Sequence, residues 1–300
     1  MGHQKRDEPF AARFDVPVAG GALHVARAGP ASDASERVVL AVHGVTASLM
    51  TFRTLARELN GDVAFLAPDL RGRGRSAALP GPYGIAQHVD DMLAVLDHVG
   101  ATRAVLVGHS MGAYVVERLA AEHPERAAGL VLLDAGLPFP LPEDPSQVLQ
   151  DIVGSSVLRL SITFPSVEQY IRGWQAHPAF LHAWSEDVDA YARYDLEDNG
   201  GGARAIASAD AVQADSTEMV LDEHTRLALE RVRAPIHLLR AEHGLFDDDP
   251  LIPADELHAF AAAHPSVRVE EVPGVNHYTL VMGASPGPAR VAAAIERAVR

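Results

Sequence analysis

Residues 103–116, Arg-Ala-Val-Leu-Val-Gly-His-Ser-Met-Gly-Ala-Tyr-Val-Val, decide the fold of this chain. Residues 104–107 are apolar and rich in valine, which predicts a short buried strand. From Met111 onward, apolar residues recur at helical spacing, which predicts a helix. Between the two lies Gly108-His109-Ser110-Met111-Gly112, a Gly-x-Ser-x-Gly sequence. Glycine at both ends of this sequence is typical of a tight strand-to-helix turn, because glycine has no side chain to clash there.

Such a turn would hold Ser110 in a strained backbone conformation, with its hydroxyl at the start of a helix. Backbone N–H groups at a helix N-terminus stabilise negative charge. Ser110 is therefore a candidate nucleophile. Because a bare Gly-x-Ser-x-Gly sequence occurs often by chance, the prediction depends on the strand pattern before it and the helix pattern after it.

The composition excludes several classes of function. The 300 residues include 25 basic and 40 acidic side chains, a formal net charge of −15, whereas a nucleic-acid or anionic membrane partner would need a basic face. The chain has no cysteine, which excludes disulfides and thiolate chemistry. No apolar run is long enough to span a membrane, and the polar residues 1–10 do not resemble a signal peptide. We therefore expect a cytoplasmic protein.

Strand and helix patterns alternate along most of the chain. This alternation is typical of an α/β fold, a mostly parallel sheet covered by helices on both faces. Strands are predicted at 14–18, 22–27, 38–42, 63–67, 104–107, 130–133, 235–239 and 267–272. Helices are predicted at 49–59, 86–99, 111–123, 254–263 and 286–299.

Residues 137–233 interrupt the alternation. No buried strand is predicted there, and aromatic residues, including both tryptophans, are concentrated in this segment. These aromatics either cover a pocket or pack on the sheet. We predict an inserted helical cap at 137–233, on a core of residues 1–136 and 234–300. Cap helices are predicted at 146–160, 166–176, 179–195 and 215–232, with a glycine-rich loop at 199–202.

The order of four motifs resembles the α/β-hydrolase family. They are His43-Gly44 after the third strand, Asp69-x-x-Gly72-x-Gly74-x-Ser76 after the fourth, the Ser110 turn, and Asn276-His277 after the last strand. The resemblance covers residues 14–136 and 234–300. It implies an α/β-hydrolase fold with an eight-stranded, mostly parallel sheet and a cap. It implies less about the reaction, because this fold hosts many chemistries.

The resemblance also implies a set of catalytic residues. Ser110 would be the nucleophile, and His277 would be the base, because it stands where the family places its histidine. The oxyanion hole would use the backbone N–H groups of Met111 and of Val45, in the loop after the third strand.

The catalytic acid is left open by the sequence. Most of the family place it after the seventh strand, where this chain has Asp247, Asp248 and Asp249. A minority use a carboxylate at the end of the sixth strand, which is Asp134 here. We favour Asp134, with Asp249 as the second choice, although an aspartate at position 134 can also be structural.

Other polar residues near these motifs are interpreted as supporting groups. His43 would order the oxyanion loop by hydrogen bonding, and His109 would be a packing residue. In the loop after the fourth strand, three residues are interpreted as structural and two arginines as either solvated or able to meet an anionic substrate. The structural residues are Asp69, Arg71 and Ser76, and the two arginines are Arg73 and Arg75.

Taken together, these features predict a serine hydrolase that cleaves a carboxylic ester or lactone through an acyl-enzyme. The aromatics of the cap favour a small to medium, mostly apolar substrate. Two alternatives remain open: a C–C bond hydrolase of a β-diketone-like substrate, and a non-catalytic small-molecule receptor on the same scaffold. We expect no metal and no organic cofactor, and the sequence is compatible with a homodimer.

Overall fold

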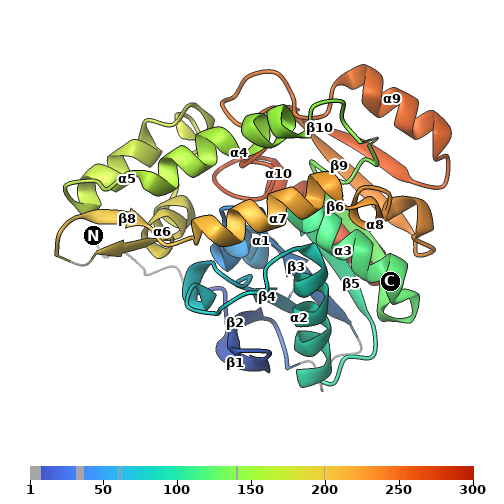
Figure 1. Ribbon diagram of the computed structural model, residues 1–300. Helices are drawn as coiled ribbons and strands as arrows, with labels where there is room; N and C mark the ends of the chain where they lie inside the picture. Colours follow the sequence, from blue (N-terminus) through green and yellow to red (C-terminus); the bar gives the residue numbers. More distant parts are fainter. Residues whose placement is uncertain (1–7, 32–36, 60, 62, 140, 199) are drawn as a thin grey trace, which may run out of the picture.

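The computed structural model describes residues 8–31, 37–59, 61, 63–139, 141–198 and 200–300 (Figure 1). Residues 1–7 of the polar N-terminal segment and Asn199 of the predicted loop therefore lie outside the described residues. The centre of the structure is an eight-stranded sheet in the order β1-β2-β4-β3-β5-β6-β9-β10. The strands are β1 (Ala12–Val18), β2 (Gly21–Ala28), β3 (Val38–Val42), β4 (Ala64–Pro68), β5 (Ala104–His109), β6 (Ala127–Leu133), β9 (Ile236–His243) and β10 (Arg268–Asn276).

Most of the sheet is parallel. β2 is antiparallel to both of its neighbours, β1 and β4, and the pairs from β4 to β10 are all parallel. Parallel strands place their carboxyl ends along one edge of the sheet, where ligands of such sheets bind. The predicted fold class, with its eight strands and mostly parallel pairing, is confirmed.

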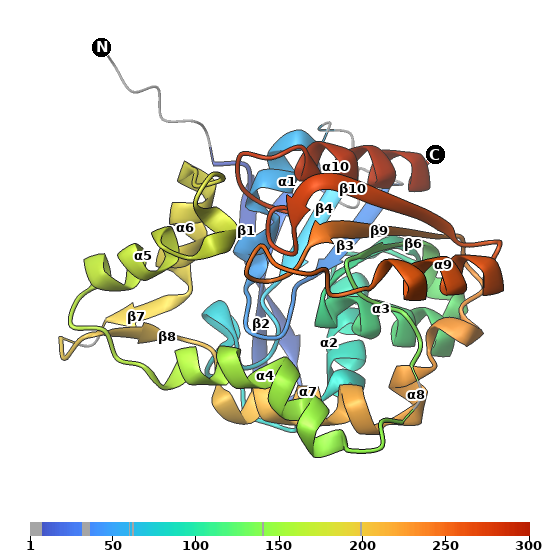
Figure 2. The same cartoon turned by 90° about the horizontal axis from the view of Figure 1, so that it is seen from above.

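Helices cover both faces of the sheet, and β5 has apolar side chains on both of these faces. Val105 and Val107 pack with the helices of one face, whereas Leu106 packs with those of the other, because successive side chains of a strand point to opposite faces. Figure 2 shows α1 and α10 on one side of the sheet and α2 and α3 on the other. The helices of the core are α1 (Arg53–Glu58), α2 (Ile85–His98), α3 (Met111–Glu122), α9 (Ala254–Ala263) and α10 (Gly287–Ala298).

The segment predicted as a cap is mainly helical. α4 and α7 lie side by side in both views, and α5 and α6 lie beyond the β1 edge of the sheet in Figure 2. α8 packs against α3 of the core. The helices of this segment are α4 (Pro145–Ser161), α5 (Val167–Gln175), η5 (Pro178–Phe180), α6 (Glu186–Tyr194), α7 (Ala209–Leu221), α8 (Glu223–Arg226) and η6 (Leu229–Arg231).

Three details of this segment differ from the sequence predictions. The helix predicted at 215–232 starts earlier, with α7, and is divided into α7, α8 and η6. The predicted helix at 179–195 is wrong in its first part, because Ser185 caps α6 by accepting a hydrogen bond from the N–H of Val188. A short antiparallel hairpin, β7 (Leu196–Asp198) with β8 (Ala203–Ala205), was not predicted. Strands of three residues are too short to show a period of two.

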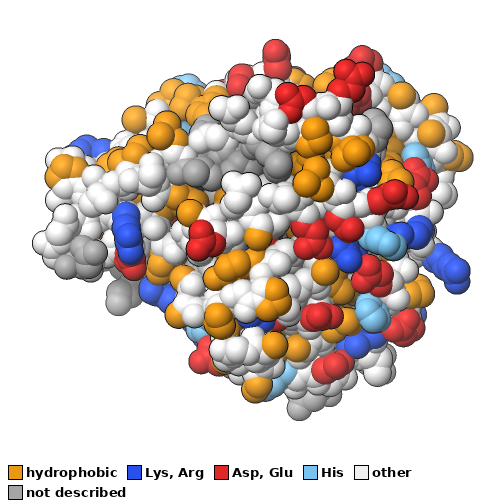
Figure 3. Space-filling model, viewed as in Figure 1, with side chains coloured by type: hydrophobic (Ala, Val, Ile, Leu, Met, Phe, Trp, Pro, Cys, Tyr) orange, Lys and Arg blue, Asp and Glu red, His pale blue; other side chains and the backbone are white. Residues whose placement is uncertain are grey.

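The surface does not gather its charge into a basic patch on the face drawn in Figure 3. Acidic side chains are spread over that face, with basic side chains and hydrophobic ones between them. In the part of the chain that the structure describes, no helix combines the length and the apolar character needed to cross a bilayer.

The turn between β5 and α3 is held by two glycines in close contact with backbone atoms. A Cβ added at Gly108 would lie 2.4 Å from the carbonyl oxygen of Gly112, and one added at Gly112 would lie 2.1 Å from the carbonyl oxygen of Val42 in β3. Since real Cβ atoms do not approach backbone atoms so closely, any side chain here must push β3, β5 and α3 apart.

We expect Gly112→Ala to lower the free energy of unfolding by about 3 kcal/mol or more, because the added methyl group has no space. Gly154→Ala is the matched control: it lies in α4 with open space around it, so it should be neutral or stabilise by up to about 1 kcal/mol. Urea denaturation of both variants checks this. Equal stability of the two alanine variants would contradict the packing described here.

Candidate active site

The predicted catalytic residues lie at the carboxyl ends of three parallel strands of the sheet. Ser110 directly follows β5, Asp134 follows β6, and His277 follows β10. Ser110 has φ 56° and ψ −128°, and its N–H donates a hydrogen bond to the carbonyl of Leu133 at 3.1 Å. A serine at positive φ is strained, and the tight turn described above imposes this conformation.

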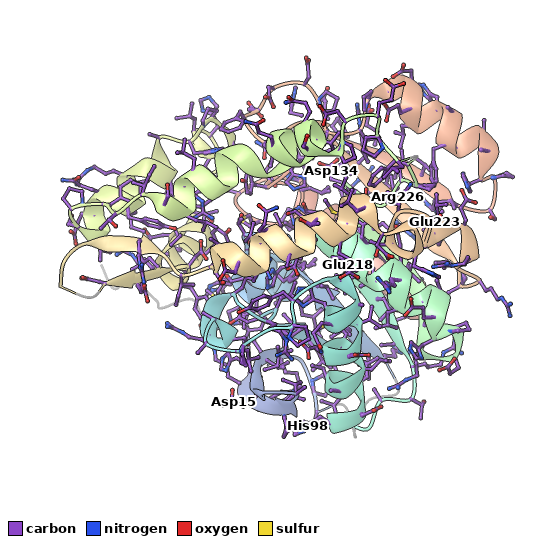
Figure 4. All side chains as sticks on the ribbon, viewed as in Figure 1. Asp15, His98, Asp134, Glu218, Glu223 and Arg226 are labelled. Carbon is purple, nitrogen blue, oxygen red and sulfur yellow. The ribbon has the colours of Figure 1, made fainter. Side chains whose placement is uncertain are left out.

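Asp134 holds His277 in a fixed orientation. The Nδ1–H of His277 donates to Oδ2 of Asp134 at 2.7 Å, and both side chains are buried. Oδ1 of Asp134 accepts a second hydrogen bond from the N–H of Ala241 at 2.9 Å. With Nδ1 protonated, a neutral His277 has its Nε2 free to accept a proton. Asp134, labelled in Figure 4, is thus the carboxylate that contacts this histidine.

The other candidate acids have different surroundings. Asp247, Asp248 and Asp249 are exposed. Oδ1 of Asp247 accepts from the side-chain amide of Asn276 at 3.1 Å, and Oδ1 of Asp248 accepts from the N–H of Phe246 at 3.2 Å. No hydrogen bond joins any of the three to His277 among the contacts of the described residues.

Two residues that support His277 were not predicted to do so. His109, interpreted from the sequence as a packing residue, is buried and donates from Nε2 to the carbonyl oxygen of His277 at 2.9 Å. Asn276 accepts hydrogen bonds at Oδ1 from the N–H groups of Tyr278 and Thr279. The Asn-x-x-Thr spacing is a capping signal that could have revealed the second of these roles.

The loop after β3 is ordered by His43, as predicted. Nδ1 of His43 donates to the carbonyl oxygen of Gly44 at 2.8 Å, while Nε2 accepts from the N–H of Leu70 at 3.0 Å. Gly44 faces the serine, since a Cβ there would lie 3.1 Å from Cβ of Ser110. The next residue, Val45, is therefore carried beside the nucleophile candidate by a fixed loop.

Arg73 corrects one sequence prediction. Its side chain is fully buried, so it can contact neither solvent nor a substrate. Its Nη1 pairs with Asp215 of α7 at 2.5 Å, and its Nε donates to the carbonyl oxygen of Val45 at 2.9 Å. Asp215 also contacts Nε2 of His88 in α2 at 2.9 Å. This buried pair thus ties the loop after β3 to a helix of the predicted cap.

The remaining residues of the loop after β4 have the structural contacts that were predicted. Asp69 accepts from the N–H groups of Leu49 and Arg75 and from the hydroxyl of Tyr194. Arg71 forms a bidentate pair with Asp91, and Ser76 accepts from the N–H of His24. Arg75 is exposed, and its guanidinium lies over the ring of Tyr194. This position agrees with the prediction that Arg75 is solvated.

A cavity of about 430 Å³ joins these groups. The five predicted site residues all line it: Ser110, His277, Asp134, Val45 and Met111. Met111 begins α3, so its N–H has no partner within the helix. Tyr191 of α6 and Met219 of α7, from the segment predicted as a cap, also line the cavity. Among the described residues, no group of three or more histidine or acidic side chains could hold a metal ion.

The comparisons with known proteins concern the family and the fold. A family model described as alpha/beta hydrolase fold matches residues 37–284. Lipase LipV of Mycobacterium tuberculosis is 43% identical over 112 residues, which are 37% of this chain and 41% of that protein. The chain thus spans about two fifths of the length of this relative.

Two further similarities extend over nearly the whole chain. 2-(Acetamidomethylene)succinate hydrolase of Mesorhizobium japonicum is 27% identical over 241 residues, 80% of this chain and 81% of the relative. The crystal structure of E-2-(acetamidomethylene)succinate hydrolase superimposes with a TM-score of 0.78 at 22% identity, covering 96% of this chain and 98% of that one. The chain belongs to the α/β-hydrolase family, because the family model matches well over half of it.

His43 gives this site a pH-dependent stability. Burial lowers the pKa of His43 to about 3, from the ordinary value of 6.5. As the pH falls below 6.5, the unfolded chain binds a proton at this histidine but the folded chain does not. Stability from this group is therefore present above pH 6.5 and is lost progressively toward pH 3.

We expect the unfolding free energy to fall with decreasing pH between 6 and 4, with His43 contributing up to about 1.4 kcal/mol per pH unit. His43→Gln should make this slope shallower, whereas the same change at the exposed His258 should leave it unchanged. Urea titrations at a series of pH values measure the slopes. Identical slopes for the wild type and His43→Gln would show that His43 does not titrate in this way.

Proposed function

We propose that this chain is a serine hydrolase that cleaves a carboxylic ester or lactone through an acyl-enzyme. The observation that carries the proposal is the 2.7 Å hydrogen bond from His277 to Asp134 in the cavity that Ser110 also lines. An activated serine needs an adjacent base whose orientation is fixed by a third group. The substrate would be a small to medium, mostly apolar molecule held under the cap, which we assign to residues 137–233.

In this mechanism Oγ of Ser110 attacks the carbonyl carbon, and its proton passes to Nε2 of His277. The N–H groups of Val45 and Met111 would stabilise the oxyanion, an effect worth about 100- to 1,000-fold in turnover for each donor. His277 then protonates the departing alkoxide as the C–O bond breaks. Water attacks the acyl-enzyme, gives its proton to His277, and releases the acid as Ser110 regains a proton.

Asp134 would keep His277 in the productive tautomer and stabilise the imidazolium that forms. Arg73 and His109 would be positioning residues, the first through the Val45 carbonyl and the second through the His277 carbonyl. Because both contacts are to backbone atoms, they fix the loops that carry the reacting groups rather than the reacting groups themselves.

Labelling with a fluorophosphonate tests the nucleophile. We expect the reagent to modify Ser110 of the wild type, located by peptide mass mapping, and to leave Ser110→Ala unmodified. A panel of p-nitrophenyl esters, lactones and a vinylogous diketone then separates ester cleavage from C–C cleavage. Labelling without turnover of any member would favour the receptor alternative, and labelling at another residue would contradict the proposal.

The acid is tested by matched asparagine variants. Asp134→Asn should lower kcat by about 10,000-fold, because the histidine loses its orienting anion and is held in the wrong tautomer. Asp249→Asn should change kcat by less than about threefold, since Asp249 is exposed. Urea midpoints of both variants show whether the fold is retained. If Asp249→Asn were the inactive variant, Asp134 would not be the acid.

A further inference from the structure

A second cavity, of about 230 Å³, lies beside the proposed catalytic one. Arg159 of α4 supplies the charged group among its described lining residues. Most of the other lining residues carry flat rings, which favour a planar occupant. The rings belong to Phe164, Tyr170, Trp174, His177, Phe246 and Tyr278.

The two cavities share a wall, and Arg159 of the second cavity contacts the loop that lines the first. Tyr278 lines both of them, and its ring lies 5.8 Å from that of His277. Nη2 of Arg159 donates to the carbonyl oxygen of Thr46 at 3.3 Å. Thr46 itself lines the catalytic cavity and follows Val45. The guanidinium therefore stands between the second cavity and the loop of the proposed oxyanion hole.

Arg159 keeps unused hydrogen-bonding capacity. Its Nη1 donates to Asp195 at 3.1 Å and to the hydroxyl of Tyr170 at 2.9 Å, and its guanidinium lies 5.1 Å from the ring of Trp174. With the bond to Thr46, these contacts use three of the five N–H donors of an arginine. About a fifth of the side chain is exposed, 22%, whereas Asp195 is fully buried.

We infer that this second cavity is a substrate subsite for a planar group that bears a carboxylate, with Arg159 as its binding cation. The inference rests on the proposed function, because the scissile ester would lie at Ser110 while the carboxylate lies at Arg159. A guanidinium binds a carboxylate through paired N–H donors, and the ring-lined surroundings exclude water and strengthen the contact. The ring walls accept the flat faces of the same group.

A purely structural role for Arg159 would have different consequences. In that role the pair with Asp195 would only join α4 to the residue that ends α6, and its loss would affect all substrates equally. A subsite instead predicts discrimination between a charged substrate and a neutral one of nearly the same shape.

The first test compares 4-acetoxybenzoate with its methyl ester at the carboxylate. Arg159→Met should lower kcat/KM for 4-acetoxybenzoate by about 10- to 100-fold, mainly through KM, because a charge-assisted contact is lost. The value for the neutral ester should fall at least tenfold less, because only the contact to the Thr46 carbonyl is lost for that substrate. Arg172→Met, which removes an exposed arginine of α5, is the control for charge alone. Equal losses on both substrates would overturn the inference.

Asp195→Asn should act in the opposite direction. Removing this carboxylate leaves Arg159 without its buried counter-charge, so kcat/KM for 4-acetoxybenzoate should rise relative to the neutral ester. Urea denaturation shows whether each variant is folded. A fall of this ratio in a folded Asp195→Asn protein would contradict a binding role for the cation.

A second test does not depend on catalysis. Benzoate should bind to Ser110→Ala and change the fluorescence of Trp174, the neutral isostere benzamide should bind at least tenfold more weakly, and Arg159→Met should abolish the difference. If the proposed function is wrong but the subsite exists, benzoate binds although neither ester is cleaved. If esters are cleaved but benzoate binds no better than benzamide, the subsite inference fails alone.

Discussion

The close approach of the β5–α3 turn to β3 is the constraint on which the rest of the structure depends. Gly112 leaves no space for a side chain against the carbonyl of Val42, and Gly108 leaves none against the start of α3. This contact forces Ser110 to positive φ and lifts it above the sheet edge. The same contact brings Gly44, at the end of β3, against Ser110. The proposed nucleophile and the loop of the proposed oxyanion hole are thereby positioned by one piece of backbone packing.

Buried polar pairs fix the groups that the backbone alone does not orient. Asp134 holds the ring of His277, and Arg73 holds the Val45 carbonyl while it pairs with Asp215 of α7. Burying such charges is costly unless each has partners, and breaking one partner leaves the other unpaired. The loop after β3 and the segment that we propose as a cap are therefore joined by an interaction that tolerates little displacement, which would suit a preorganised oxyanion hole.

Much of the core could be predicted from the sequence because its strands and helices are long enough to show their periods. The eight strands, the Ser110 turn and the placement of His277 followed from apolar patterns and from motif order. Asp134 could only be favoured, because four aspartates stood at positions that the family uses, and the choice depends on which carboxylate reaches His277. Arg73 was misread because its partner, Asp215, is 142 residues away and gives no local signal. The hairpin β7–β8 and the break before α6 were missed for a related reason, since short elements are set by contacts and caps rather than by periodicity.

The most direct measurement of the central claim is a crystal structure of the protein after reaction with a phosphonate that mimics the tetrahedral intermediate of ester hydrolysis. The account predicts phosphorus bonded to Oγ of Ser110, with a phosphonyl oxygen about 2.7–3.1 Å from the backbone nitrogens of Val45 and Met111. His277 would still be hydrogen-bonded to Asp134. An adduct on another residue, or a phosphonyl oxygen that neither of the two backbone nitrogens reaches, would contradict it.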